Sequence, residues 1–532
     1  MKKVVKFIPL VFMPFLLTGC FVPYIFGDSS SEKPSDTFEP TSYSYDEDAD
    51  YNILPSLYTY KDYTDQNYYD LGAAPSVGEA RLLVIPVWFT DSSDYITSKS
   101  NVRKDIIAAY FGSTSDTGWQ SVKSFYEAES RGRLIISGIV TDWYSCGKSS
   151  TSFYSEESGA TQTASLVNSA VSWYKKTYSV SNLSDFDRDK DGYIDGVMLI
   201  YGSPDYSAMK NSKASNMWAY CYWLQNTSAK SKSNPGANQF FWASYDFMYG
   251  TNKASMRTGK SSYASGDTNH CSIDAHTYIH EMGHVFGLED YYDYHTTKYN
   301  PAAGFSMQDS NVGAHDPFSK FSLGWGDAIV PQKTSTFTLK PIESSGQFVI
   351  LTPNTDKSSI SAFDEYIIIE LYTPTGLNQF DSNYKYMSNY PQGPKVSGVR
   401  VWHVDARLYG ISKSSSSGFS GRLTTNPYDS SAVLGVTHAT SNSGGGDYGA
   451  MYAGSYSYNI LQLIRNSTSA SYTSKDDLKS SDLFKSGDTF SLSKYKSQFV
   501  NSAKLNSNKD LGWEVTFGTL SSEGISITVT KA

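Results

Sequence analysis

Two histidines of this chain lie four residues apart, in the stretch His280-Glu-Met-Gly-His284. Residues four apart share one face of a helix, so His280 and His284 can turn both imidazoles toward one metal ion. Glu281 follows the first histidine directly, where its carboxylate can reach a metal-bound water without itself being a ligand. The pattern predicts a zinc site in which the metal polarises a carbonyl and acidifies its water, while Glu281 acts as the general base.

A catalytic zinc usually has a third protein ligand. Gly287 follows the two histidines and predicts a helix end that turns the chain back toward the metal. Asp290, ten residues after His280, lies at the offset where metzincin-type proteases carry their third ligand, although histidine is commoner there. Glu289 is the alternative donor, and on spacing we prefer Asp290.

Met307 follows the proposed third ligand by 17 residues. A methionine at this distance favours a Met-turn, a tight loop whose thioether packs beneath the metal, although a lone methionine is usually core filler. His315 follows soon after, and for it we favour a structural role over a contact with substrate.

A second group of candidate ligands lies in the stretch Asp187-Arg-Asp-Lys-Asp191-Gly-Tyr-Ile-Asp195. Its oxygen donors at positions 1, 3, 5 and 9 (Asp187, Asp189, Asp191 and Asp195) and its glycine at position 6 match an EF-hand calcium loop. Position 12 is Met198 in place of the bidentate glutamate, and a strand-like run follows. We therefore predict a calcium loop that leads into a strand, with a solvated acidic turn as the alternative.

The N-terminus predicts export. Three lysines precede an apolar run over residues 7–17 that is too short to span a bilayer, as in a signal peptide. The run ends in Leu17-Thr-Gly-Cys20, which favours lipidation of Cys20 and attachment to a bacterial membrane, with an ordinary secretory signal as the alternative. Three cysteines remain, Cys146, Cys221 and Cys271, and their pairing is left open because at most one disulfide can form among them.

Composition narrows the class of protein. The 532 residues are too many for one ordinary core, so two or three domains are expected. The net charge of −9 and the absence of a basic stripe argue against a nucleic-acid partner. A mean hydropathy of −0.40 excludes a polytopic membrane protein.

Apolar patterning divides the chain into two kinds of sequence. Up to about residue 328, buried-strand runs at 81–89, 133–140 and 197–201 alternate with helical spacing at 102–111, 122–129 and 164–178. Beyond it, short β-like runs are separated by turn residues. We predict a signal peptide (1–20), a tether or pro-segment (21–76), an α/β (α+β) metzincin-like zinc protease domain (77–328) and a C-terminal all-β, sandwich-like region of one or more modules (329–532).

These motifs, in this order, resemble the immune inhibitor A family of exported bacterial zinc metalloproteases. The similarity covers about residues 80–530, and its motifs are the stretches 82–89, 121–126, 132–134, 187–195, 280–290, 306–325, 365–370 and 398–405. The resemblance implies zinc ligation by His280, His284 and Asp290, with Glu281 as the base. Two features depart from the family pattern: the lipid anchor, and a segment 21–76 that is shorter than the pro-region of some members.

The sequence therefore predicts a lipid-anchored, extracytoplasmic endopeptidase that uses Zn²⁺, binds Ca²⁺ and cleaves proteins or peptides. The alternative is a catalytically inert surface binding or adhesion protein on the same fold. Substrate specificity, cleavage of residues 21–76, envelope type and oligomeric state are not encoded in these motifs.

Overall fold

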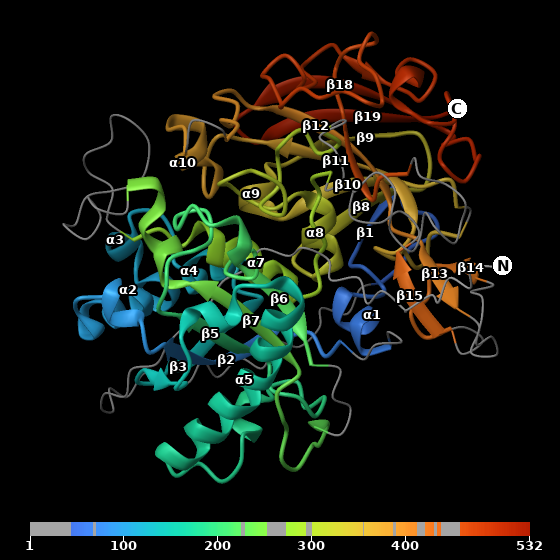
Figure 1. The fold of residues 1–532 in the computed structure, drawn as a ribbon. Coiled ribbons are helices and arrows are strands. Elements are labelled where there is room, and N and C mark those ends of the chain that lie inside the picture. The colour runs from blue at the N-terminus through green and yellow to red at the C-terminus, as the bar shows by residue number, and fades with distance from the viewer. Residues whose placement is uncertain are drawn as a thin grey trace, which may run out of the picture.

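The computed structural model of the chain describes residues 44–66, 71–224, 229–252, 273–293, 300–354, 356–386, 390–411, 421–429, 433–437 and 458–532. A mixed sheet with helices on both faces lies in the lower part of Figure 1, and two β-sheets lie in its upper part. The helix that carries both motif histidines, α7 (His276–Val285), lies where the two parts meet.

The lower sheet has the order β3-β2-β5-β7-β6, and β4 pairs with β2 at one end. Only β6 is antiparallel to its neighbour; the other pairings are parallel. The strands are β2 (Gly78–Trp88), β3 (Leu134–Val140), β4 (Tyr144–Ser145), β5 (Val197–Tyr201), β6 (Tyr220–Trp223) and β7 (Gln239–Ser244). A parallel sheet is normally covered by helices on both faces, and this sheet follows the rule.

Side chains of β2 alternate between two hydrophobic cores. Leu82 and Val84 belong to the core that also holds residues of α2 (Lys99–Phe111), α4 (Val122–Glu129) and α7. Leu83 and Ile85 belong to the core on the other face, which is covered by α5 (Glu156–Thr177). Because successive residues of a strand face opposite sides, the continuous apolar run seen in the sequence is explained by burial of both faces.

The upper part contains two sheets that face each other across one core. One has the order β1-β8-β10-β11-β12-β16, and the other has the order β17-β18-β19-β9. Their residues form a common cluster that includes Val349, Ile367, Phe517 and Ile527. The first sheet contains β1 (Tyr51–Leu54), β8 (Asp327–Pro331), β10 (Gln347–Leu351), β11 (Glu365–Tyr372), β12 (Gly398–Asp405) and β16 (Leu461–Ile464), and the second contains β9 (Ser335–Leu339), β17 (Thr489–Phe490), β18 (Trp513–Ser521) and β19 (Gly524–Lys531).

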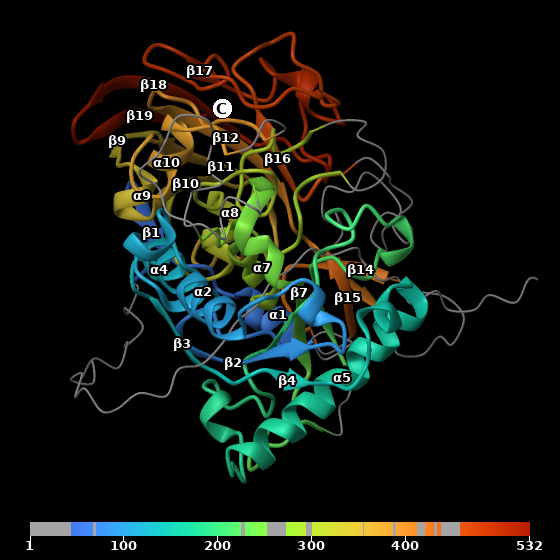
Figure 2. The ribbon, with the colours of Figure 1, turned by 60° about the vertical axis from the view of Figure 1, so that its left-hand side comes forward.

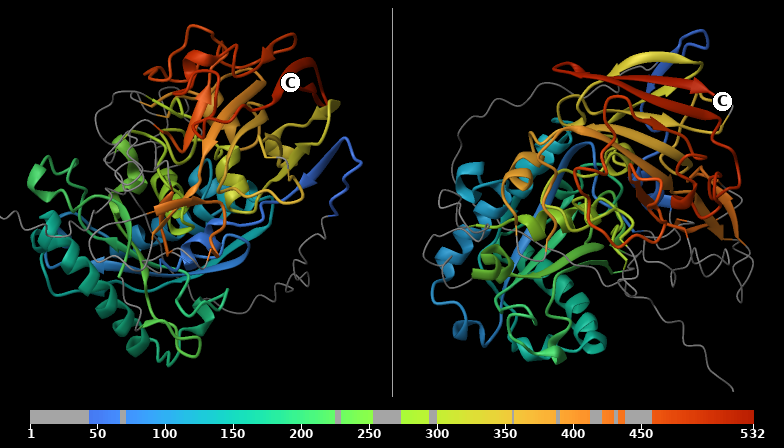
Figure 3. Two further views of the ribbon diagram at one scale, coloured as in Figure 1. Left: turned by 90° about the vertical axis from the view of Figure 1, so that its right-hand side faces the viewer. Right: turned by 90° about the horizontal axis from the view of Figure 1, so that it is seen from above.

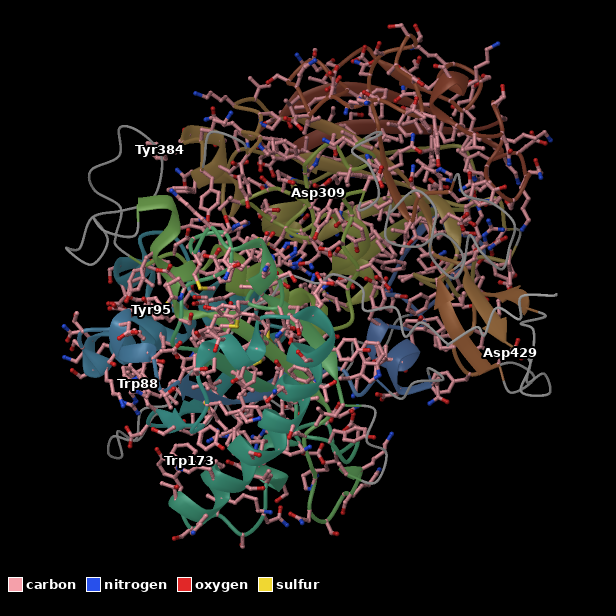
Figure 4. The ribbon with its side chains drawn as sticks, viewed as in Figure 1. Trp88, Tyr95, Trp173, Asp309, Tyr384 and Asp429 are labelled. Carbon is pink, nitrogen blue, oxygen red and sulfur yellow. The ribbon has the colours of Figure 1, made fainter. Side chains whose placement is uncertain are left out.

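The opposite face of the six-stranded upper sheet packs toward α7. Phe348, Ile368 and Trp402 belong to the same core as α7 and β2. In the view from above, the red and yellow strands of the upper part lie mainly to one side of the blue and teal helices of the lower part (Figure 3). Figure 4 places Trp173 of α5 at the far lower side and Asp309 near the level where the two parts meet.

The remaining elements are short. A separate sheet has the order β14-β13-β15, built from β13 (Leu408–Ile411), β14 (Gly421–Thr424) and β15 (Val433–Thr437). The short helices are α1 (Tyr60–Gln66), α3 (Thr114–Thr117), α8 (Pro317–Ser322), α9 (Ile342–Ser345) and α10 (Asn378–Asn383).

The prediction of a mixed α/β chain is confirmed. A purely β C-terminal region is not confirmed, because α9 and α10 interrupt it. Residues 51–66, expected as tether or pro-segment, form strand β1 and helix α1, and β1 pairs with β8 in the upper sheet. No helix among the described residues is long and apolar enough to cross a membrane.

Candidate metal centre

Helix α7 carries the two motif histidines and is fully packed. It begins after Ala275, where the carboxylate of Asp274 accepts a hydrogen bond from the backbone N–H of His276 at 2.9 Å. Every residue from Tyr278 to Val285 is buried. A helix that is buried all round cannot rotate without breaking this packing, so the direction of its polar side chains is fixed.

Helix α7 ends in the turn predicted from Gly287. This residue has a φ of +99°, the left-handed region that favours glycine. The N–H of Leu288 returns to the carbonyl of Gly283 at 3.0 Å, which closes the helix end. The chain then reverses and brings Asp290 back against the helix.

His280, His284 and Asp290 converge on one point. Oδ1 of Asp290 lies 3.0 Å from Nε2 of His280 and 3.2 Å from Nε2 of His284. All three residues are buried. Donors about 2.0 Å from a tetrahedral zinc are separated by about 3.3 Å, so these distances fit a zinc-ligand set.

Both imidazoles are held with Nε2 facing that point. Nδ1 of His280 lies 2.6 Å from the carbonyl oxygen of Met307, and Nδ1 of His284 lies 2.8 Å from that of Leu288. A carbonyl can only accept, so each Nδ1 carries the proton and each Nε2 presents its lone pair. Such backbone contacts orient metal-binding histidines in general.

Asp290 is oriented in the same way. Its second oxygen, Oδ2, accepts a hydrogen bond from the hydroxyl of Tyr292 at 3.1 Å, which leaves Oδ1 toward the histidines. Burial alone would raise the pKa of Asp290, but the two imidazoles outweigh burial and lower it. The carboxylate is therefore anionic, as a metal ligand must be.

Glu281 lies beside this donor set. Its oxygens are 4.0 Å from Nε2 of His280 and 3.7 Å from Nε2 of His284. The side chain is fully buried, and within the described part of the chain neither oxygen accepts a hydrogen bond. Burial, followed by the charge of Asp290, raises the pKa of Glu281 well above its usual value. A carboxyl group in this environment suits proton transfer.

Glu289, the alternative third ligand, is only partly buried, whereas Asp290 is fully buried beside the histidines. Carboxylate oxygens of Asp290 and Glu281 lie within 4.0 Å of the Nε2 atoms of the two histidines. The structure therefore brings Asp290 rather than Glu289 onto the two imidazoles.

Met307 is fully buried next to the metal motif. Its backbone carbonyl accepts the hydrogen bond from His280 described above. The backbone carbonyl of the next residue, Gln308, accepts a hydrogen bond from the N–H of Tyr291 at 2.8 Å. The loop around Met307 thus contacts both the helix and the turn of the metal motif. The sequence indicated the loop, but not that its carbonyl orients a histidine.

Gln308 is a site residue that the sequence analysis missed. Its Oε1 lies 3.2 Å from Nε2 of His315, whose Nδ1 lies 3.1 Å from Oε1 of Glu129. Lys320 reaches the same Glu129 oxygen at 3.1 Å. His315 therefore belongs to a buried polar network behind α7, in line with the structural role favoured for it.

The acidic loop places three of its four predicted ligands together. Donor oxygens of Asp187, Asp189 and Asp195 lie within 4.8 Å of one another. Asp191 instead pairs with Lys61 of α1 at 2.6 Å, and Lys61 also contacts Asp189 at 2.7 Å. This internal cation was not foreseen, because nothing in the sequence joins residue 61 to the loop.

The described residues include two of the four cysteines, Cys146 and Cys221. Cys20 and Cys271 lie outside them, so lipidation and any disulfide of Cys271 stay predictions. Cys146 and Cys221 form no disulfide with each other or with any other described residue, and burial raises the pKa of each thiol.

The comparisons with known proteins agree with the metal motif. Residues 92–315 match the family model described as immune inhibitor A peptidase M6, catalytic domain. This range includes α7, the turn at Gly287, Asp290 and Met307. No curated protein matches the chain. Residues 92–315 are thus similar to the catalytic domain of the immune inhibitor A peptidases, and this similarity supports a metallopeptidase domain in this part of the chain.

Proposed function

We propose that the protein is an exported, lipid-anchored zinc endopeptidase in which His280, His284 and Asp290 hold the metal and Glu281 is the general base. The observation that carries this proposal is the convergence of Asp290 Oδ1 on both Nε2 atoms, 3.0 and 3.2 Å away. The two Nδ1 contacts to backbone carbonyls support it, because they leave only the Nε2 lone pairs for a metal.

When bound, zinc would polarise the scissile carbonyl and lower the pKa of a water molecule. Glu281 is placed to take the proton of that water and to deliver it to the departing amine. Its buried oxygens, which accept no hydrogen bond from the described residues, are free for both transfers. With zinc bound, Asp290 would serve as a ligand and Glu281 as the base, so the two neighbouring carboxyl groups would have separate roles.

The test of this function is the Glu281→Gln variant beside the parent protein. The amide that replaces the carboxylate has nearly the same shape but cannot accept a proton, so we expect zinc content and melting temperature to stay at parental values. Loss of a positioned base commonly lowers the rate about 10²–10⁴-fold, and hydrolysis of casein should fall by that factor. A chelator should abolish the parental activity, and added zinc should restore it.

Two results would overturn the assignment. Parental hydrolysis by Glu281→Gln would remove Glu281 from the mechanism. A parent protein that binds zinc but cleaves neither casein nor a peptide library would favour the alternative, an inert binding or adhesion protein on this fold.

For the acidic loop we propose a calcium site formed by Asp187, Asp189 and Asp195. Asp187 is buried, and its Oδ1 has no hydrogen-bond partner among the described residues. An unpaired anionic oxygen in this position favours a bound cation, and oxygen donors suit calcium. Lys61 already neutralises part of the loop, so we expect calcium to bind weakly and to compete with this side chain.

Localisation belongs to the same proposal. We propose that Cys20 is the lipidated residue and that the catalytic domain acts on proteins or peptides outside the membrane. In cells fed a labelled fatty acid, the parent should carry the label and Cys20→Ser should not. An unlabelled parent protein would favour an ordinary secretory signal.

A further inference from the structure

The N-terminal segment contacts the metal motif. We use the name N-terminal brace for residues 51–66 and 71–76. In Figure 2 its helix, α1, lies below α7 and beside β7. The sequence left open whether these residues are removed as a pro-segment, but their contacts are those of an integral part of the enzyme.

The brace is first held by its backbone. All four residues of β1 pair with β8, from Tyr51 with Pro331 to Leu54 with Ala328. The N–H of Ala74 donates to the carbonyl of Val285, the last residue of α7, at 2.9 Å. Hydrogen bonds within a sheet are lost together, so the brace cannot leave without opening the edge of the upper sheet.

Helix α1 packs directly on the turn that follows α7. A Cβ atom at Gly287 would lie 3.0 Å from the methyl group of Thr64 and 3.4 Å from the ring of Tyr60. Both side chains are fully buried. The left-handed turn that returns Asp290 to the histidines is thus covered by α1, and a Cβ atom at Gly287 would require Thr64 to move by a few tenths of an ångström.

The aromatic packing of α1 extends to other parts of the molecule. The ring of Tyr60 lies 6.3 Å from that of Phe318 in α8 and 5.4 Å from that of Phe363, just before β11. The Tyr60 hydroxyl is buried without a hydrogen-bond partner among the described residues. Tyr60 therefore acts through the packing of its ring, and its hydroxyl contributes nothing that phenylalanine would lack.

The brace also carries a charge that the catalytic domain needs. The ammonium group of Lys61 contacts Asp65, Asp189 and Asp191 at 2.9, 2.7 and 2.6 Å, and donates to the carbonyl of Ala73 at 2.7 Å. Removing the brace would leave the carboxylates of Asp189 and Asp191 without this cation. Backbone pairing, packing and charge thus all join residues 51–76 to the rest of the enzyme.

We propose that the N-terminal brace remains in the mature enzyme and positions the turn that carries Asp290, and that any proteolytic maturation cuts before Tyr51. Tyr60 and Thr64 are positioning residues in this proposal, because they act on the metal site through Gly287. The activity readouts below rest on the proposed peptidase function, whereas fragment retention and metal retention do not.

The first experiment uses the full chain with the recognition sequence of a site-specific protease inserted between Gln66 and Leu71. After cutting, we expect the N-terminal fragment to stay bound through gel filtration, with unchanged zinc content and kcat. Release of the fragment together with a fall in kcat would also support the proposal. A rise in kcat, or release with kcat unchanged, would overturn it, because the segment would then be an inhibitor or dispensable.

The second experiment compares point variants in the full chain. We expect Tyr60→Ala to lower kcat by about 10- to 100-fold, with a smaller change in KM, and to speed the loss of zinc to a chelator. Tyr60→Phe should match the parent in each measurement. Leu54→Ala, which removes buried packing in β1 away from the turn, is the matched control for general damage.

This control separates positioning from stability. Leu54→Ala should lower the melting temperature while leaving kcat and the rate of zinc loss unchanged. Equal loss of zinc from Leu54→Ala and Tyr60→Ala, or unchanged zinc retention in Tyr60→Ala, would overturn the positioning role. If the parent lacks peptidase activity, the proposed function is wrong. Fragment retention and zinc retention still test the role of the N-terminal brace in that case.

Discussion

At the scale of single residues, the metal centre depends on which atoms are held and which are left available. His280 and His284 each donate a hydrogen bond from Nδ1 to a backbone carbonyl. Asp290 accepts one at Oδ2 from the hydroxyl of Tyr292. The remaining donor atom of each side chain faces the same point. Three weak constraints on orientation thus produce one site with the spacing that a tetrahedral metal requires.

The third ligand gives a residue-scale prediction. Asp290→Ala should lose most of its zinc and its activity, whereas Glu289→Ala should keep both, because Oδ1 of Asp290 lies 3.0 and 3.2 Å from the Nε2 atoms of the two histidines. Zinc content of the two purified variants, measured by atomic emission, checks this. Metal loss from Glu289→Ala instead would assign the ligand to residue 289 and leave the peptidase assignment intact.

Gly283, between Glu281 and His284, gives a second prediction. A Cβ atom there would lie only 2.6 Å from the amide carbon of Gln308. Gly283→Ala should therefore lower the melting temperature and activity, although alanine normally stabilises a helix by about 1 kcal/mol relative to glycine. Unfolding and kinetics of the purified variant measure both effects.

The Gln308→Ala background is the control for this prediction. Once the amide is removed, the added methyl group has room, so Gly283→Ala should there be neutral or stabilising. The two substitutions should show a coupling of about 1 kcal/mol or more. Additive effects would mean that the contact with Gln308 is not the reason for glycine at this position.

At the scale of elements, α7 is positioned by segments from distant parts of the sequence. The Met307 loop holds its histidine, α1 covers the turn at its end, and the six-stranded upper sheet packs on the same core. The acidic loop before β5 depends on α1 in turn, since Lys61 lies among its carboxylates. Stability of the loop should therefore depend on both a metal ion and a side chain.

Calcium gives the prediction at this scale. A ligand that binds only the folded state stabilises it by about 2.7 kcal/mol at a hundredfold excess over Kd. Calcium should raise the melting temperature of the metal-stripped parent, and the rise should be larger in Lys61→Met, which lacks the competing ammonium group. Differential scanning calorimetry with and without calcium measures both shifts.

The control for this prediction removes an oxygen donor. Asp187→Asn should abolish the calcium shift in either background, because Asp187 Oδ1 is the buried oxygen without a hydrogen-bond partner among the described residues. A calcium shift that persists in Asp187→Asn would place the ion elsewhere. A shift that is no larger in Lys61→Met would show that Lys61 does not compete for the loop.

At the scale of the whole molecule, the peptidase part and the upper sheets share a core. The six-stranded upper sheet contributes Ile350 and Trp402 to the core around α7, and Val349 and Val401 to the core between the two upper sheets. One sheet thus forms a wall of both cores. Two parts joined in this way should not unfold independently.

We therefore predict a single thermal transition for the described fold. Phe517→Ala, in the far core, should lower the temperature at which peptidase activity is lost by the same amount as the circular dichroism midpoint. A buried phenylalanine contributes about 3–5 kcal/mol relative to alanine, so the shift should be measurable. Leu520→Ala, at an exposed position of the same strand, is the control and should change neither temperature.

Separate transitions would contradict this prediction. An upper part that melts first, with activity retained above that temperature, would show that the shared sheet does not couple the two cores.

The sequence alone determined the local features of this protein. Periodicity predicted the strands that became β2, β3 and β5 and the helices α2, α4 and α5, because burial imposes a period that is visible in the residues themselves. The spacing of His280, Glu281, His284 and Asp290 predicted that these side chains lie together for the same reason: one helix and one glycine turn fix their relative positions.

Only the tertiary structure decided which distant residues support that site. The Met307 carbonyl, the Gln308 amide and Lys61 act through contacts between segments that no local pattern links. The sequence also suggested a tether where the structure has β1 and α1, because a polar, tyrosine-rich segment has no strong periodicity of its own. Its order comes from pairing with β8 and from packing under Gly287, and such long-range contacts are formed only when the whole chain folds.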